Sequence, residues 1–429
     1  MTAALVIALL FGLIFLAMPV SFAMFVAGIV GLWWEGGWHV ALGVLKTSPY
    51  QAAASYTLTT FPMFVLMAEV MGATRITGDL FRAANGWVGH LRGGLAYAAV
   101  FGGTMLAAAC GSSSAAAATL SSAIYPELRK YGYGEAFSTG ALAAVGTLSI
   151  MIPPSIALIF YGILTEVSVG KLLIAGVVPG LMTALAYGLV IWRVLRKSDV
   201  GVQPRQPMGR RVRASLPALP MIVLLAAMLV MIYSGIATPT EVGALGALFA
   251  FAIGFAMMRM DRAAIVGALG RATRSSAMIL AIIAFSSVFA VFLSLSGTPQ
   301  ALLQAVQESG LGPLPVLLLV IAVLLVLGIF LDQIAILIIT LPLVHPLLTG
   351  LGYDEIWLGV LVVKTAEIGL LTPPVGLNLF IVSGSSRVPV ATVARGVVPF
   401  VAAELVLLVL LVAFPAIATW LPSLSQAGN

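Results

Sequence analysis

Apolar runs of roughly 18 or more residues recur along the whole chain, and each is long enough to cross the hydrocarbon core of a bilayer, about 30 Å thick. Of the 429 residues, 61% are hydrophobic and only 8% are charged, which is too little charge to cover a water-soluble surface. The sequence therefore predicts an all-α polytopic membrane protein. Because no basic residue precedes or interrupts segment 1–34, we expect it to be membrane helix and not a cleaved signal peptide.

The charged and reactive residues exclude several classes of protein. The net charge of +6 comes from basic residues in short segments between apolar runs, which is typical of cytoplasmic anchoring and not of nucleic-acid binding. The single cysteine, Cys110, allows no internal disulfide and no cysteine-based metal site, and the three histidines lack ligand spacing. No nucleotide-binding glycine-rich loop occurs. We therefore expect neither an enzyme nor an ATP-driven pump.

An internal repeat with a constant offset of 220 residues divides the chain in two. Segment 125–155 aligns with 345–375, and the matches include both proline pairs, Pro153-Pro154 with Pro373-Pro374. Segment 176–179 aligns with 396–399 in the same register. The basic segment 193–213 separates the copies, which predicts a first repeat at 1–192, a cytoplasmic linker at 193–213 and a second repeat at 214–429.

Equivalent loops of the two copies carry opposite amounts of positive charge. Arg92 and Arg129 flank the centre of the first copy, whereas the matching loops 296–313 and 345–355 contain no Lys or Arg. Because cytoplasmic loops collect Lys and Arg, equivalent loops should lie on opposite faces, as in an inverted-topology repeat. In this arrangement both termini lie outside, and all 21 basic residues are cytoplasmic except Lys46, Lys171 and Lys364.

Each copy is expected to contain a re-entrant hairpin. Segment 94–125 has basic residues at both ends and is too short for two crossings, which need about 40 residues. We expect it to dip into the membrane and return, with its tip at 110–115. The matching hairpin, 315–346, places its tip near Asp332 and needs a partner or an ion for that carboxylate. The alternative is a single span over 315–331 with Asp332 at a solvated end.

A helix with a proline pair in mid-run follows each hairpin, at 136–165 and 356–386. Paired prolines break a helix and free carbonyl oxygens, which are ligands suited to a small cation. The N-terminus after each break suits a carboxylate. The alternative is two kinks that only help helices to pack. About ten spanning helices should accompany the two hairpins.

Four charged residues lie within apolar runs. Lys364 and Glu367 have i, i+3 spacing and are expected to pair on one helix face, with a direct substrate contact as the alternative. Glu69 is expected to form an interfacial hydrogen bond, with ion or proton binding as the alternative. Glu404 is the fourth charged residue within an apolar run, and no role follows for it from the sequence.

Over nearly its full length the chain resembles the large membrane subunit of tripartite ATP-independent periplasmic (TRAP) transporters, the DctM-like family. The resemblance rests on four stretches: GSSSA at 111–115, YGY at 131–133 with GTLSIMIPPS at 146–155, AGVVPG at 175–180, and IGLLTPPVGLN at 368–378.

The resemblance implies an elevator-type carrier of the bacterial inner membrane with sodium as coupling ion and no other cofactor. It also implies a small four-helix membrane subunit and a periplasmic binding protein that delivers a small organic anion, such as a C4-dicarboxylate, keto acid or sialic acid. A rival of related fold is a stand-alone sodium/dicarboxylate symporter. Rivals of another class are a channel and a membrane scaffold.

The resemblance also assigns site residues by motif. The first sodium site would comprise Ser112, Ser113, Gly146, Thr147 and Pro153. The second would comprise Gly328, Asp332, Gly369, Thr372 and Pro373. Substrate would contact Ser114, Pro154, Ser155, Pro374 and Asn378.

Overall fold

The structure is a computed structural model that describes residues 2–74, 76–196, 200 and 202–425. All regular elements of these residues are helices, as the sequence predicts. The first half forms α1 (Thr2–Phe15), α2 (Val20–Ala53), η1 (Tyr56–Thr59), α3 (Thr60–Ala73), α4 (Thr77–Val88), α5 (Gly94–Cys110), α6 (Ser113–Lys130), α7 (Glu135–Met151), α8 (Ile156–Thr165) and α9 (Val169–Leu195). The second half forms α10 (Met208–Ser215), η2 (Leu216–Ala218), α11 (Leu219–Tyr233), α12 (Pro239–Ala256), α13 (Arg262–Leu295), α14 (Thr298–Glu308), α15 (Pro313–Phe330), α16 (Gln333–Gly350), α17 (Glu355–Leu371), α18 (Leu377–Ser386), α19 (Val390–Ala413) and α20 (Ala416–Ser423).

Helices of the second half follow those of the first at the spacing of the sequence repeat. α7 begins at Glu135 and α17 at Glu355, and each is interrupted at its proline pair before a short second helix, α8 or α18. The segments expected to hold hairpins lie within the helix pairs α5–α6 and α15–α16, and two residues join the arms of each pair. The predicted linker runs from the last turn of α9 into α10, and its residues 197–199 and 201 lie outside the described part.

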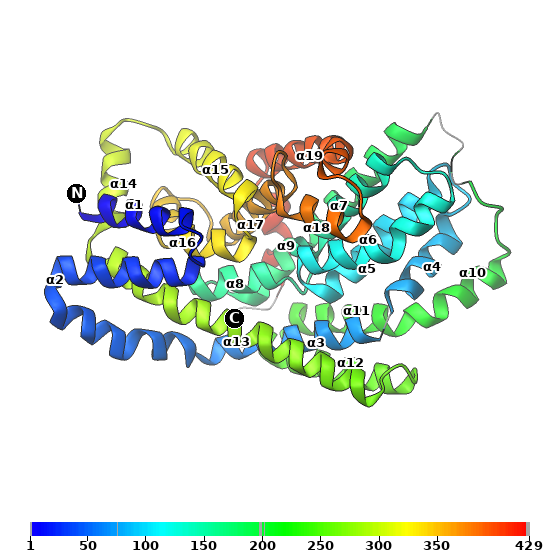
Figure 1. Cartoon of the computed structure of the whole chain (residues 1–429), viewed down its shortest axis with the longest axis horizontal. Helices are drawn as coiled ribbons and strands as arrows, with labels where there is room; N and C mark the ends of the chain where they lie inside the picture. The colour runs from blue at the N-terminus through cyan, green and yellow to red at the C-terminus, as the bar shows by residue number, and fades with distance from the viewer. Residues whose placement is uncertain (1, 75, 197–199, 201, 426–429) are drawn as a thin grey trace.

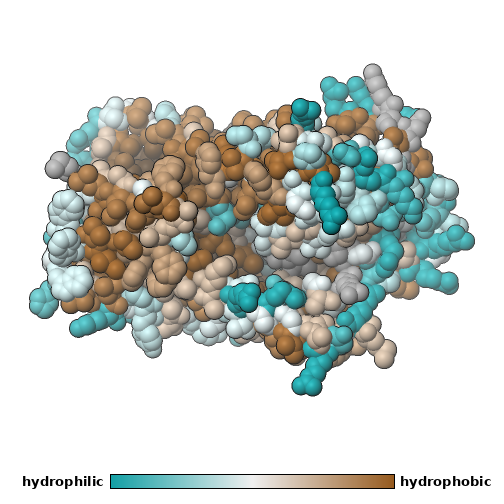
Figure 2. All heavy atoms as spheres, viewed as in Figure 1, coloured by the Kyte–Doolittle hydropathy of each residue, from teal (hydrophilic) through white to brown (hydrophobic). Residues whose placement is uncertain are grey.

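The two hairpins start from opposite ends of the molecule. α4 leads into the first hairpin and lies with α10 at the right-hand end of Figure 1, whereas α14 leads into the second and lies with the N-terminus at the left-hand end. Hydrophilic residues gather at the right-hand end in Figure 2, and hydrophobic residues cover most of the remaining visible face. This arrangement agrees with the opposite entry of the hairpins expected from the charged loops.

Among the described residues, nine helices are long and apolar enough to cross a membrane, or ten if the pair α7–α8, bent by 40°, is one span. The sequence predicts about ten spans beside the hairpins, but α15 and α16 are themselves among the nine. Each of these arms has 18 residues, so length alone does not distinguish an arm from a span. Their position beside the first hairpin tip, described below, makes that distinction.

Four long helices, α2, α3, α12 and α13, pack side by side along the lower edge of Figure 1 and are here called the outer layer. α2 and α13 approach closely at Gly28, where a Cβ atom would lie 2.9 Å from Phe289 Cα. Phe285 of α13 packs between Phe22 and Phe25 of α2, with ring centroids 5.0 Å apart in both pairs. Small residues that admit a neighbouring backbone are the usual means of helix association in membranes.

The remaining core, α5–α9 with α15–α19, is here called the central bundle. α7 is buried throughout Ser138–Met151, and α17 is buried throughout Trp357–Leu371. Helices that are apolar on every side belong in the core of a large bundle. α19 crosses α7 at Gly396, where a Cβ atom would lie 1.7 Å from the Ala136 carbonyl oxygen. α7 and α17, the first parts of the two broken helices, are therefore the most enclosed elements of the described fold.

Candidate substrate and cation site

The first hairpin turns at Gly111 and Ser112. Gly111 has φ +60°, a left-handed conformation that glycine adopts without strain. Ser112 is the N-cap of α6, and its hydroxyl accepts a hydrogen bond from Ala115 N at 3.5 Å. Cys110 precedes this turn, and its side chain lies outside the described part. The serine run thus forms both the turn and the start of the second arm.

The second hairpin turns at Leu331 and Asp332. The Asp332 carboxylate caps α16 by accepting a hydrogen bond from Ala335 N at 3.0 Å. This hairpin approaches α17 closely, because a Cβ atom on Gly328 would lie 2.7 Å from Gly369 Cα. Gly376 N donates to Ile329 O at 3.2 Å, which ties the hairpin to the second helix break. Asp332 is therefore held at a tip beside the broken helix and not at the free end of a span.

Both helix breaks are stabilised by hydroxyl groups. Ser155 accepts a hydrogen bond from Leu158 N at 3.2 Å as the N-cap of α8, and it donates to Ile150 O. Thr372 donates to Ile368 O at 2.7 Å at the end of α17. The Ser155 hydroxyl satisfies the carbonyl whose helical donor would be Pro154, and the Thr372 hydroxyl satisfies the carbonyl that the Thr372 N–H leaves free by bonding Gly369 O.

The two tips and the helix ends beside both breaks line one cavity of about 410 Å³. Its lining from the central bundle comprises Gly111–Ala115, Ile156, Ala157, Asp332–Ile334, Leu370 and Leu377. Its lining from the outer layer comprises Val65, Ala68 and Glu69 of α3 with Ser275, Met278, Ile279 and Ile282 of α13. A larger hollow of about 630 Å³ lies near the starts of α3, α9 and α12, but neither tip nor break lines it.

Four helices begin at the central cavity: α6, α8, α16 and α18. The first turn of a helix has free N–H groups and a partial positive charge, which favours an anion. No Lys or Arg is among the residues that line the cavity in the described structure, and Glu69 and Asp332 are its charged members. Helix N-termini are thus the main protein groups available there to an anion.

Glu69, on the outer-layer wall, is paired with Arg271 of α13. Arg271 Nε donates to Glu69 Oε2 at 2.6 Å. The predicted interfacial hydrogen bond of Glu69 is therefore present as an ion pair at the edge of the cavity.

The predicted site residues divide into three groups. Ser112, Ser113, Ser114 and Asp332 line the cavity. The glycines lie at backbone crossings beside it: a Cβ atom on Gly146 would lie 2.9 Å from Ala117 Cα, and Gly328 faces Gly369. The others do not line the cavity: Thr147, Pro153, Pro154, Ser155, Thr372, Pro373, Pro374 and Asn378. Asn378 is fully buried, with no partner for its amide among the described residues.

The Thr147 hydroxyl faces away from the cavity, into a buried polar cluster. It lies 2.6 Å from Ala144 O and 3.1 Å from the Tyr187 hydroxyl. The same cluster contains the Lys364–Glu367 pair expected from sequence, with Lys364 Nζ 3.4 Å from Glu367 Oε1. Sequence reasoning missed the role of Glu404, whose Oε2 lies only 2.6 Å from Lys364 Nζ.

Comparison with known proteins identifies the family. The family profile of the tripartite ATP-independent periplasmic transporter, DctM component, matches residues 7–417. The chain is 37% identical to the C4-dicarboxylate TRAP transporter large permease protein DctM of Pseudomonas aeruginosa, over 87% of this chain and 88% of that protein. It is 33% identical to the corresponding protein of Vibrio cholerae, over 99% and 98%. It is 30% identical to the ectoine TRAP transporter large permease protein TeaC of Halomonas elongata, over 98% of each chain.

A solved structure supports the fold. The crystal structure of the Alcanivorax borkumensis YdaH transporter superposes with a TM-score of 0.67 over 89% of each chain, at 13% sequence identity. The family resemblance inferred from the proline-pair and serine motifs is thus confirmed by a match over almost the whole chain. The chain belongs to the DctM component family, the large permease subunits of TRAP transporters, and is a multi-pass protein of the bacterial inner membrane.

Proposed function

We propose that this large permease subunit carries a small organic anion into the cell in symport with sodium, and that a periplasmic binding protein delivers the anion. The observation that carries the proposal is the convergence of two hairpin tips and four helix N-termini on one cavity of about 410 Å³. That volume fits a small solute.

The charge of the cavity supports coupling to a cation. Helix N-termini attract a carboxylate, but Asp332 and Glu69 oppose it and no basic side chain lines the wall among the described residues. A bound sodium ion would supply the missing positive charge, and serine hydroxyls, Asp332 and backbone carbonyls are oxygen ligands of the hard type that sodium prefers. Ser112, Ser113 and Asp332 are the side chains on the cavity wall to which we assign this role. Thr147 would contribute only through its backbone, since its hydroxyl points elsewhere.

The relatives support an organic acid as substrate. Those of Pseudomonas aeruginosa and Vibrio cholerae, at 37% and 33% identity, are named for C4-dicarboxylates. More distant ones are named for ectoine and sialic acid. We therefore propose a C4-dicarboxylate first, with keto acids and sialic acids as the next classes. The family also supports two partners, a small four-helix membrane subunit and the binding protein.

The test is uptake of labelled succinate into proteoliposomes that contain this chain and the small subunit, with the cognate binding protein outside. We expect saturable uptake that requires both an inward sodium gradient and the binding protein. Labelled ectoine and labelled sialic acid test the other substrate classes. Each is first tested for binding to the cognate binding protein and then for uptake. Uptake that ignores the sodium gradient and never saturates would indicate a channel and contradict the proposal.

The second candidate is a stand-alone sodium/dicarboxylate symporter. Sodium-driven succinate uptake by this chain in the absence of both partners would establish this alternative. Absence of flux in every combination would instead point to a scaffold.

A further inference from the structure

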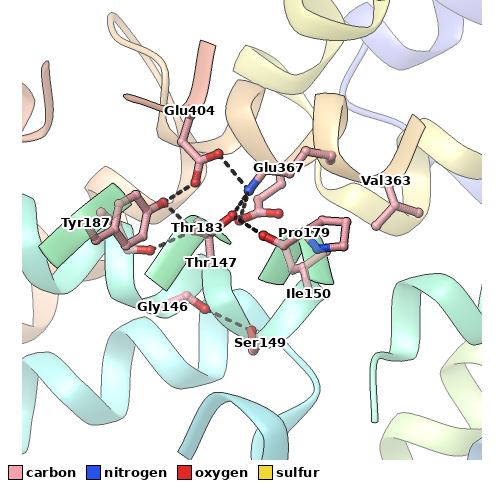
Figure 3. A network of polar contacts seen from close by, with 12 residues as sticks. Gly146, Thr147, Ser149, Ile150, Pro179, Thr183, Tyr187, Val363, Glu367 and Glu404 are labelled. Atoms are coloured by element: carbon pink, nitrogen blue, oxygen red, sulfur yellow. Dashed lines mark hydrogen bonds and ion pairs between the residues drawn. The ribbon is translucent and has the colours of Figure 1, made fainter. Parts of the chain in front are cut away.

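A cluster of charged side chains is buried inside the central bundle, apart from the central cavity, which we here call the transport cavity. Lys364 and Glu367 of α17 and Glu404 of α19 are all fully buried, at 0% exposure. Lys364 Nζ lies 2.6 Å from Glu404 Oε2, 2.9 Å from Thr183 Oγ1 and 3.4 Å from Glu367 Oε1. Tyr187 of α9 donates its hydroxyl hydrogen to Glu404 (Figure 3). Four helices of the bundle, α7, α9, α17 and α19, therefore meet at this cluster.

Formal charges do not balance if every group is ionised. One lysine and two glutamates leave a net charge of −1 at a site without solvent contact, which is among the costliest arrangements in a membrane protein. A single additional proton on one of the carboxylates would make the cluster neutral.

The contacts of the two carboxylates indicate which of them holds that proton. Glu404 accepts a hydrogen bond from Tyr187, and its Oε2, although it has no hydrogen bond of good geometry, forms an ion pair with Lys364 Nζ at 2.6 Å, so both of its oxygens face a donor group. Glu367 has only the 3.4 Å contact with Lys364, and its Oε2 atom has no partner among the described residues. A carboxylate this poorly paired and fully buried is far more stable as the neutral acid.

The neighbouring hydroxyls cannot supply the missing hydrogen to Glu367. Thr147 belongs to the same cluster, but its hydrogen is directed to Ala144 O at 2.6 Å. Thr183 directs its hydrogen to Pro179 O at 2.9 Å, and the hydroxyl hydrogen of Tyr187 is directed to Glu404. Each of these three hydroxyl hydrogens is thus directed to a group other than Glu367.

The groups facing Glu367 from other helices do not change this balance. The titratable side chains that contact the cluster in the described structure are Lys364, Glu404 and Tyr187. α15, α18 and α20 also pack on α17 and contain no titratable side chain. His345 of α16 and Tyr161 of α8 pack together near Glu355, about three turns along α17 from Glu367. The other charges of the packed helices lie near helix ends: Glu135 in the first turn of α7, Lys171 and Arg193 in the first and last turns of α9, and Arg395 in the second turn of α19.

We propose that the Lys364–Glu367–Glu404 cluster is a proton-binding site, separate from the transport cavity, in which Glu367 carries a proton and Lys364 and Glu404 form the ion pair. Loss of this proton at alkaline pH places an uncompensated negative charge between α7 and α17. Because these two helices carry the breaks at the transport cavity, the charge opposes the packing on which that cavity depends.

The direct test is infrared spectroscopy of the purified full-length chain in detergent. The wild-type protein should show the carbonyl stretch of a buried, protonated carboxylic acid at neutral pH, and this band should disappear when the pH is raised. The band should be absent from Glu367→Gln and retained in Glu308→Gln, whose exposed carboxylate only accepts a hydrogen bond from Gln304 at 2.7 Å. A wild-type spectrum without the band, or a band that persists in Glu367→Gln, would overturn the proposal.

A second test rests on the proposed function and can fail independently of the first. Above the transition seen by infrared, wild-type sodium-driven succinate uptake should fall about tenfold per pH unit, as loss of one proton requires. Glu367→Gln, assembled with the same partners, should lack this fall. An equal fall in both proteins would refute the link between the cluster and transport. If no succinate moves at any pH while the infrared band behaves as expected, the proton site stands and the transport assignment fails.

If Glu367→Gln does not fold, the wild-type protein alone still tests whether protonation of the cluster is coupled to transport. The infrared band and uptake should be lost over the same pH interval in one preparation. Loss of uptake while the band is still intact would contradict the coupling.

Discussion

Thr147 and Glu367 occupy the same position in the two halves of the chain, 220 residues apart, and both belong to the buried polar network where α7 contacts α17 (Figure 3). At the positions equivalent to Lys364 and Glu404 the first half has Ala144 and Ala184. The two copies therefore differ in chemistry where they meet: the first has a hydroxyl, and the second has a carboxyl together with a lysine and a second carboxylate.

The ion pair within this cluster should be essential for stability. Lys364→Met removes the cation that lies 2.6 Å from Glu404, so the folded protein must bury or protonate a second carboxylate. We expect a loss of about 3–5 kcal/mol, seen as a lower thermal unfolding temperature in detergent. The double variant Lys364→Met/Glu404→Gln removes both charges and should recover most of this loss. If the two changes are simply additive, the pair does not act as a unit.

Asp332→Asn should weaken activation by sodium while leaving folding nearly intact. Asparagine caps a helix about as well as aspartate, so α16 should keep its start, but a charged cation ligand is lost. We expect the sodium concentration for half-maximal uptake to rise about tenfold, equivalent to about 1.4 kcal/mol. Thr372→Val should act in the same direction, because it removes the hydroxyl that stabilises the second helix break beside this tip.

The matched control for this substitution is Asp354→Asn. Asp354 caps α17 in the same manner, accepting from Trp357 N at 2.8 Å, but it does not line the cavity. Its sodium activation should be that of the wild type. Wild-type sodium activation in Asp332→Asn and Thr372→Val alike would remove the case for a cation at the second tip.

Gly328 should tolerate no side chain. Because a Cβ atom there would lie 2.7 Å from Gly369 Cα, Gly328→Ala must push the second hairpin away from the broken helix. A cost of about 1–3 kcal/mol is expected from overpacking, measured by thermal unfolding. Gly384→Ala is the control, since a Cβ atom at that helical position has no atom within 4 Å. Equal stability of the two variants would mean that the hairpin is not held at this contact.

The Glu69–Arg271 pair should influence substrate affinity more than stability. The Arg271 side chain is 56% exposed and that of Glu69 is 28% exposed, so Arg271→Gln should cost less than about 1 kcal/mol of stability. It would leave a bare carboxylate at the cavity wall, and we expect the succinate concentration for half-maximal uptake to rise. Arg274→Gln, exposed on the same helix, is the control. An unchanged succinate dependence would place Glu69 outside the substrate path.

The local pattern of the sequence was enough to predict most of the central bundle. The constant 220-residue offset, the serine tip and the two proline pairs predict the segments that become α5–α8 and α15–α18. The i, i+3 spacing also predicts that Lys364 and Glu367 pair, which is confirmed. These features depend on neighbours along the chain or on a repeat, both of which are visible in sequence.

Contacts between distant helices could not be predicted in the same way. Glu404 lies 37 residues beyond Glu367 on another helix, and Tyr187 belongs to the other half of the chain. The direction of the Thr147 hydroxyl was equally hidden, because α7 is buried on all sides and its pattern marks no preferred face. The wall of the cavity from α3 and α13 was missed because no motif connects Glu69 with Arg271 or Ser275.

The walls of the cavity come from two parts of the fold, and residues of the two parts would contact the substrate at different steps. The serine tip, Asp332 and the four helix starts belong to the central bundle, whereas Glu69 and Ser275 belong to the outer layer. Any sliding of the bundle past that layer would carry the tips along and leave α3 and α13 behind. A bound substrate would then keep its contacts with the central bundle and lose those with the outer layer. A substitution at Ser112 would therefore affect both binding and release of the substrate, whereas a substitution at Ser275 would affect only one of the two steps.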